Sequence, residues 1–125
     1  MDRNQIMRRA LWTTAFLNLG GAALFAFPDS VGRLAGMPAP APRLYTSFLA
    51  FIVVMFGVTY AWLARQPRID RAVVTLSAIG KAGFFFVAFS CWLLGDLAGK
   101  VVLAASGDLL FASIFVWWLV VSAEV

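Results

Sequence analysis

Four long apolar runs constrain the fold of this chain more than any other feature of its sequence. They cover residues 10–27, 44–64, 72–94 and 101–123. Each run is about 20 residues long, the length that an α-helix needs to cross a hydrocarbon core of roughly 30 Å. Only 13% of the residues are charged, whereas about 25% are charged in a typical soluble domain. We therefore expect residues 1–125 to form a single integral membrane domain.

The connections between the runs indicate how the segments are arranged. A segment surrounded by lipid must satisfy its own backbone N–H and C=O groups, and a lone segment can do so only as a helix. The second and third connections are short, so consecutive helices should lie beside each other and run antiparallel. The sequence therefore predicts an all-α, up-down four-helix bundle in the membrane.

The distribution of positive charge predicts the orientation. Six arginines fall on the side of the N-terminus and of the second connection: Arg3, Arg8, Arg9, Arg65, Arg68 and Arg71. Three basic residues fall on the other side: Arg33, Arg43 and Lys100. Positive residues concentrate on the cytoplasmic side of membrane proteins, so we expect both termini in the cytoplasm. The first run starts like a signal peptide but stays apolar as far as Phe27, and we expect it to be a retained helix.

The first connection is the only long one, and we expect it on the outer side. Pro28, Asp29 and Ser30 form a helix-start signal, and Gly36 is a helix-stop signal. We expect a short helix of one or two turns lying at the outer interface. It is either a simple connector or a lid over a cavity that opens outwards.

Lys81 lies near the middle of the third apolar run, where a charge is costly. Insertion scales put that cost at roughly 2.5–3.5 kcal/mol. Asp108, in the fourth run, is the only other ionisable residue deep inside an apolar run. The helical rise places the two Cα atoms about 9 Å apart in depth. A flexible lysine stem can bridge much of such an offset. We therefore expect a direct or water-bridged pair between Lys81 and Asp108.

Further polar residues fall near this pair. Asn18, in the first run, lies at nearly the depth of Lys81 and could join the same network. Ser77 precedes Lys81 by four residues and Thr14 precedes Asn18 by four, and this spacing places each pair on one helix face. These five residues are the candidate intramembrane polar or ligand site. The candidate apolar walls of a pocket beside them are Phe84, Phe85, Phe111 and Phe115.

Several roles fit such a site. The pair could fix the register of the bundle, a role that buried ion pairs have in some proteins. It could instead line a pocket for a small lipophilic or lipid-like molecule, because intramembrane ionisable residues mark functional sites. A proton pathway is less supported, since a relay needs further titratable groups deep in the membrane. An enzyme is the least supported class, because a single lysine without a base is weak evidence for catalysis.

The composition excludes several classes of site. The chain has no histidine, which removes histidine-ligated metals, histidine-ligated haem and Ser-His-Asp triads. We expect no metal and no cofactor. The net charge of +4 does not indicate nucleic-acid binding, because the arginines flank the apolar runs instead of forming a basic stripe.

Small residues give an assembly signal. Gly20, Gly21, Ala22 and Ala23 in the first run allow close helix approach, and so do Gly80 and Gly83 in the third. They serve either packing within the bundle or contact with another protomer. We expect a structural or accessory protein that self-associates or joins a larger membrane complex. The alternative is a binder or carrier of a lipophilic small molecule.

Four short motifs resemble those of a known group of proteins. They are Pro28-Asp29, Tyr60-Ala61, Gly80-Lys81 and Gly107-Asp108-Leu109. In this arrangement the chain resembles small bacterial four-helix membrane proteins, some of which are described as DoxX-like. The resemblance covers most of the chain and implies a multi-pass protein of the bacterial inner membrane, without implying an activity.

Overall fold

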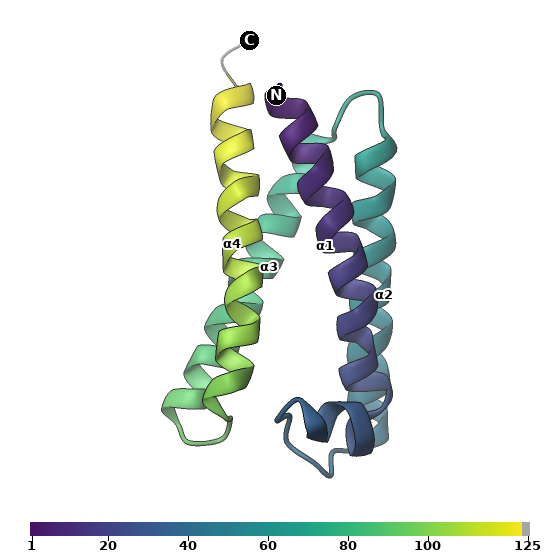
Figure 1. Ribbon diagram of the computed structural model, residues 1–125, viewed down its shortest axis with the longest axis vertical. Helices are drawn as coiled ribbons and strands as arrows, with labels where there is room; N and C mark the ends of the chain where they lie inside the picture. Colours follow the sequence, from purple (N-terminus) through teal and green to yellow (C-terminus); the bar gives the residue numbers. More distant parts are fainter. Residues whose placement is uncertain (124–125) are drawn as a thin grey trace.

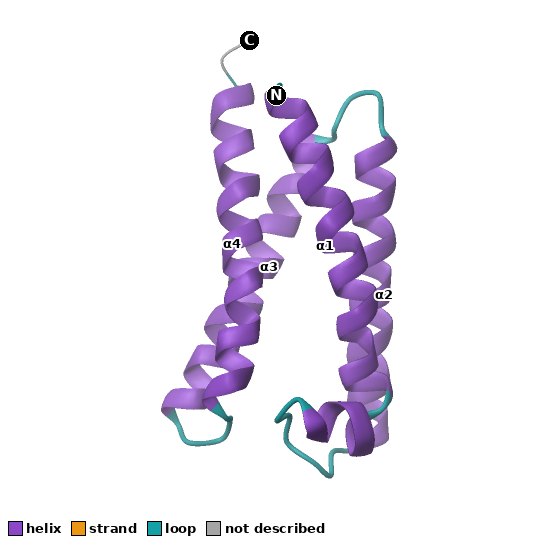
Figure 2. Ribbon diagram, in the orientation of Figure 1, coloured by secondary structure: helices purple, strands orange, loops and turns teal. Residues whose placement is uncertain are grey.

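The computed structural model describes residues 1–123, and this part of the chain is helical without any strand (Figure 2). Its elements are α1 (Arg3–Ala26), the π-helix η1 (Pro28–Gly32), α2 (Arg43–Arg65), α3 (Arg71–Leu93) and α4 (Gly99–Ser122). The predicted all-α class is confirmed. The last two residues of the predicted domain 1–125 lie outside the described residues.

Three helices are long and apolar enough to cross a membrane, namely α2, α3 and α4. They match three of the four predicted segments. Helix α1 has 24 residues but is not among the three, because Arg3, Arg8, Arg9 and Asn18 make it more polar. Its membrane crossing, and with it the complete four-crossing topology, remains a prediction.

Helix α1 begins well before the apolar run at residue 10, because its first turn is capped. The Asp2 carboxylate accepts a hydrogen bond from the Asn4 N–H at 3.3 Å. The Gln5 side chain accepts one from the Asp2 N–H at 3.2 Å. This reciprocal capping box satisfies N–H groups that the start of a helix leaves without partners. Hydropathy alone does not register such a start.

The four α-helices form two antiparallel hairpins, α1 with α2 and α3 with α4 (Figure 1). The start of α1 and the end of α4 lie together at one end of the molecule, here called the terminal end. The connections between α1 and α2 and between α3 and α4 lie at the opposite end, here called the loop end. The hairpins meet at the terminal end and diverge towards the loop end (Figure 1).

The apolar core lies in the half of the molecule nearest the terminal end. Met7, Leu11, Leu63, Val74 and Phe115 are fully buried there and come from all four α-helices. Large apolar side chains elsewhere are exposed on the outer faces of the helices, as lipid-facing residues of a membrane protein are. The tight packing at one end holds the two hairpins in a fixed relation.

Arginine side chains form hydrogen bonds with the last carbonyl groups of α2 and α4 at the terminal end. Arg8 donates to the Ala64 carbonyl at 2.8 Å, at the end of α2. Arg3 donates to the Val121 carbonyl and Arg71 to the Leu119 carbonyl, each at 2.7 Å, in the last turn of α4. These carbonyls have no partner within their own helix, and a cation there also complements the helix dipole.

The first connection contains a short helical segment at the predicted place, although it is a π-helix. Its closing hydrogen bond runs from the Gly32 N–H to the Phe27 carbonyl at 2.9 Å. The helical turns end at Gly36, whose φ of 92° is a left-handed conformation that favours glycine. The position of this segment at a membrane interface remains a prediction.

Close helix packing occurs at Gly57 and not at the four glycines expected from the sequence. A Cβ atom on Gly57 would lie 3.3 Å from the Ala15 carbonyl oxygen and from the Asn18 Cβ atom, both in α1. The same atom on Gly20, Gly21, Gly80 or Gly83 would meet nothing within 4 Å. The expected packing role of these four glycines within the bundle is therefore wrong, because Gly21 and Gly80 border the space between the hairpins and Gly20 and Gly83 lie on outer faces.

Replacing Gly57 with valine should destabilise the α1–α2 hairpin. Extra methyl groups in a well-packed contact typically cost about 1–3 kcal/mol. Unfolding in detergent, followed by circular dichroism, should show this loss for Gly57→Val. Gly83→Val is the control, because the glycine has open space around it. Equal stability of the two variants would contradict the close contact.

Candidate functional site

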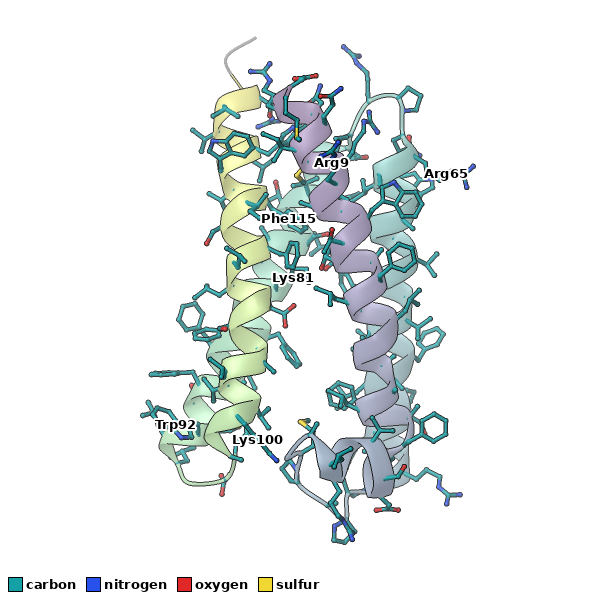
Figure 3. All side chains as sticks on the ribbon, viewed as in Figure 1. Arg9, Arg65, Lys81, Trp92, Lys100 and Phe115 are labelled. Atoms are coloured by element: carbon teal, nitrogen blue, oxygen red, sulfur yellow. The ribbon has the colours of Figure 1, made fainter. Side chains whose placement is uncertain are left out.

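A cavity of about 390 Å³ lies between the two hairpins. All four α-helices line it, together with Met37 from the first connection. Most of its wall is apolar side chain or glycine. The polar exceptions are Thr14, Asn18, Tyr60, Lys81 and Asp108. Figure 3 shows Lys81 about midway along the molecule, with Phe115 nearer the terminal end and Lys100 at the loop end.

The charged pair predicted from the sequence is present. The Lys81 Nζ atom lies 2.8 Å from the Asp108 Oδ1 atom, so the two form a hydrogen-bonded ion pair between α3 and α4. The Lys81 side chain is 4% exposed and that of Asp108 is 26% exposed. Each charge therefore has its opposite in contact, which is the condition for keeping charge in an apolar interior.

The ammonium group has further partners from both hairpins. Its Nζ atom lies 3.5 Å from the Asn18 Oδ1 atom of α1. It also lies 5.0 Å from the centre of the Tyr60 ring of α2 and 5.6 Å from that of the Phe111 ring of α4. A cation within about 6 Å of an aromatic ring is attracted to its π face. Lys81 thus contacts all three other α-helices.

Two polar groups of the cavity wall lack a protein partner. The Asp108 Oδ1 atom binds Lys81, but the Oδ2 atom accepts no hydrogen bond from residues 1–123. The Thr14 hydroxyl is fully buried and has no hydrogen-bond partner in the same range. Buried hydroxyls nearly always have a partner, in the protein or outside it. The partly exposed Asp108 carboxylate can receive a hydrogen bond from a ligand, and the Thr14 hydroxyl is a second unsatisfied group in the same wall.

Four of the five predicted polar residues come together at the cavity, namely Lys81, Asp108, Asn18 and Thr14. Ser77 does not line it. Its hydroxyl is buried and donates to the Val73 carbonyl one turn earlier at 2.7 Å. Ser77 does lie one helical turn before Lys81. However, a serine hydroxyl in a helix can hydrogen-bond to the backbone of that same helix instead of to a neighbouring side chain.

Two of the four phenylalanines expected as pocket walls lie at the cavity. Phe84 and Phe111 line the cavity, whereas Phe85 and Phe115 do not. Phe85 stacks on Phe89 with ring centres 6.0 Å apart, away from the cavity. Phe115 is fully buried in the core, with its ring centre 6.0 Å from that of Tyr60. Successive residues of a helix point in directions about 100° apart, and here the direction after Phe84 takes Phe85 off the cavity wall.

Sequence reasoning missed Tyr60 and Met37 as cavity residues. Tyr60 is 2% exposed and lies between Lys81 and the core. Its phenol is a polar group inside an apolar run, which is the available signal in the sequence. Met37 reaches the cavity only because the first connection folds back across the loop end, and no sequence pattern indicates that path.

The loop end is bridged by one long side chain. Lys100, at the start of α4, donates to the Leu34 carbonyl of the first connection at 3.4 Å. Its aliphatic stem lies against Gly36. The two hairpins are therefore joined at both ends, by the apolar core at one and by this contact at the other, and the cavity lies between.

The arrangement is suited to binding. Within residues 1–123 no three His, Cys, Asp or Glu side chains gather as metal ligands would. The polar groups of the cavity are one ion pair, an amide, a phenol and a hydroxyl, surrounded by apolar walls, which is the usual make-up of a small-molecule site. Comparisons of the chain with protein-family models, curated proteins and solved structures find no match.

Replacing Asp108 with alanine should destabilise the protein. Removing one partner of a buried pair leaves the other charge uncompensated, at a cost of about 3 kcal/mol. The Lys81→Met, Asp108→Leu double variant should recover most of this loss, because it removes both charges. Thermal unfolding of the purified proteins in one detergent compares the three. If Asp108→Ala unfolds like the wild type, the pairing is not needed for the fold.

Proposed function

We propose that this chain is a multi-pass membrane protein that binds a small lipophilic molecule in the cavity between its hairpins. The observation that carries the proposal is open space beside the buried ion pair. A pair with a purely structural role needs only tight packing around it. Here the same side chains border a cavity of about 390 Å³, a volume within the usual range of ligand sites, about 300–1,000 Å³.

Three glycines support this function. Gly21, Gly80 and Gly107 line the cavity, and a Cβ atom on any of them would meet nothing within 4 Å. Glycine weakens a helix by up to about 1 kcal/mol relative to alanine. At these positions it brings no close helix contact in return. What it provides is room inside the cavity.

The proposal includes a membrane topology. All four α-helices cross the membrane, with both termini in the cytoplasm and η1 at the outer interface. The charge distribution supports this orientation, because six arginines belong to the terminal end and its neighbouring connection. We also propose a place in the bacterial inner membrane among DoxX-like proteins, which rests on the short motifs of the sequence.

Self-association is the second candidate, with the chain as an accessory or structural subunit. Gly20 and Gly83 favour it, because both are exposed and neither lines the cavity. Small residues on an outer helix face permit close approach of another membrane helix. A second copy of this chain could pack there without affecting the cavity.

Cysteine labelling tests the topology. In a Cys91→Ala background, single cysteines at Ala39 and Gln66 should react from opposite sides of the membrane with a reagent that cannot cross it. Gln66 should react only from the cytoplasmic side. Labelling of both positions from one side would contradict the proposed crossing of α2.

Filling the cavity should abolish ligand binding. The chain has two lysines, so protein labelled with ¹³C at lysine Cε gives one signal for Lys81 and one for Lys100. In lipid nanodiscs, at least one of the probes 1-decanol, decanoic acid and decylamine should shift the Lys81 signal. Gly80→Leu should weaken that binding by at least about tenfold, which is 1.4 kcal/mol.

Gly83→Leu is the matched control. It lies on the same helix, is exposed and has the same open space around its Cα atom, but does not line the cavity. Its binding should equal that of the wild type. If none of the three probes shifts Lys81, or if the two leucine variants respond alike, the proposed function is wrong.

A further inference from the structure

We infer that the molecule bound in this cavity has an uncharged hydroxyl group at its polar end, and that this hydroxyl binds Asp108. The inference rests on the proposed function and specifies the chemical class of the ligand. Three observations support it: the charge of the cavity, the contacts of Lys81, and the two polar groups that have no protein partner.

The cavity carries no net formal charge. Lys81 and Asp108 are its only charged residues, and they compensate each other across 2.8 Å. A carboxylate, phosphate or ammonium head would enter without a counter-ion of its own. Removing an ion from water costs several kcal/mol even after the protein relaxes. An uncharged head avoids most of that cost.

The Lys81 ammonium group has few free N–H donors with which to bind an anion. Its ammonium group has three N–H donors. One is directed at Asp108 and another lies within reach of Asn18. The rings of Tyr60 and Phe111 cover further directions around it. Its side chain is 4% exposed, so an anionic head would have to displace one of these partners to contact it.

The groups left without partners match a hydroxyl. The free Asp108 Oδ2 atom is an acceptor only, so the ligand must donate a hydrogen bond to it. The buried Thr14 hydroxyl can donate as well as accept. A hydroxyl on the ligand can donate to Asp108. A ketone or ester cannot donate, and neither can a hydrocarbon.

The apolar wall of the cavity indicates where the apolar part of the ligand lies. From the polar groups, the lining continues towards the loop end through Gly21, Leu24 and Phe25 of α1 to Met37. Asn18 and Phe25 are seven residues apart on one helix, so this stretch is about 10 Å long. The hydroxyl therefore lies deep in the cavity, with the apolar part of the ligand extending towards the loop end.

The three decyl probes test the inference, because they share one apolar chain and differ in the head. At neutral pH, 1-decanol is uncharged, decanoic acid is an anion and decylamine is a cation. Titration of each into wild-type nanodiscs, with the Lys81 signal as readout, gives three affinities. The Gly80→Leu variant provides the baseline for partition into the lipid. We expect 1-decanol to bind at least about tenfold more tightly than either ion.

The outcomes separate the inference from the proposed function. Cavity-dependent binding with decanoic acid or decylamine equal to or tighter than 1-decanol overturns the inference and leaves the proposed function standing. Decyl methyl ether, which lacks the donor, should bind about tenfold more weakly than 1-decanol. Equal binding of the ether also overturns the inference. If no probe binds above the baseline, the proposed function and the inference both fail.

A charge-switched variant gives a second test. Asp108→Asn keeps the size of the side chain but leaves the cavity with a net charge of +1. The preferred probe should then change from 1-decanol to decanoic acid. An unchanged preference for 1-decanol in a folded variant would show that Asp108 does not select the head group. If the variant does not fold, the order of affinities in the wild type still decides the inference.

Discussion

The structure depends on the compensation of one positive charge in an apolar interior. Lys81 carries that charge in α3, and Asp108 of α4 neutralises it at 2.8 Å. Both residues belong to the same hairpin, so the ion pair by itself does not connect the two halves of the molecule. The same ammonium group adds weaker contacts with the other hairpin, to Asn18 of α1 and Tyr60 of α2. Lys81 therefore joins the two hairpins at the cavity, in addition to the apolar core at one end and the Lys100 contact at the other.

The division of the molecule into a packed half and a hollow half follows from where the side chains are large. Towards the terminal end, Met7, Leu11, Leu63 and Phe115 fill the space between the hairpins. Towards the loop end the facing positions include Gly21, Gly80 and Gly107. Small side chains and divergent helices together leave a space that the protein itself does not occupy. This is the physical basis for assigning a binding role to a site that first looks like a structural ion pair.

Much of the helical framework could be predicted from the sequence, because hydropathy and run length are strong signals. The bounds of α2, α3 and α4 differ from the predicted ones by only one or two residues. The pairing of Lys81 with Asp108 could be predicted as well, since no other deep charge is available to either residue. The early start of α1 could not, because it depends on the capping residues Asp2 and Gln5 and not on hydropathy.

The lining of the cavity could be predicted only in part. Glycines in membrane helices usually mark close contacts, and only their geometry shows that Gly80 borders empty space while Gly57 touches α1. Likewise, Phe85 and Phe115 have the same composition signal as Phe84 and Phe111 but point elsewhere. Tertiary packing determines which face of a helix is turned towards the cavity, and a single sequence indicates that face only weakly.

The arginine contacts at the terminal end have a consequence for how a ligand could enter and leave the cavity. Arg3, Arg8 and Arg71 fasten the last turns of α2 and α4 to neighbouring segments through carbonyl oxygens. Directly beneath them lies the packed core. The packed core therefore closes the cavity on the side of the terminal end. Under the proposed function, the protein would therefore take up and release its ligand on the loop side of the core and would not pass it through the bundle to the terminal end.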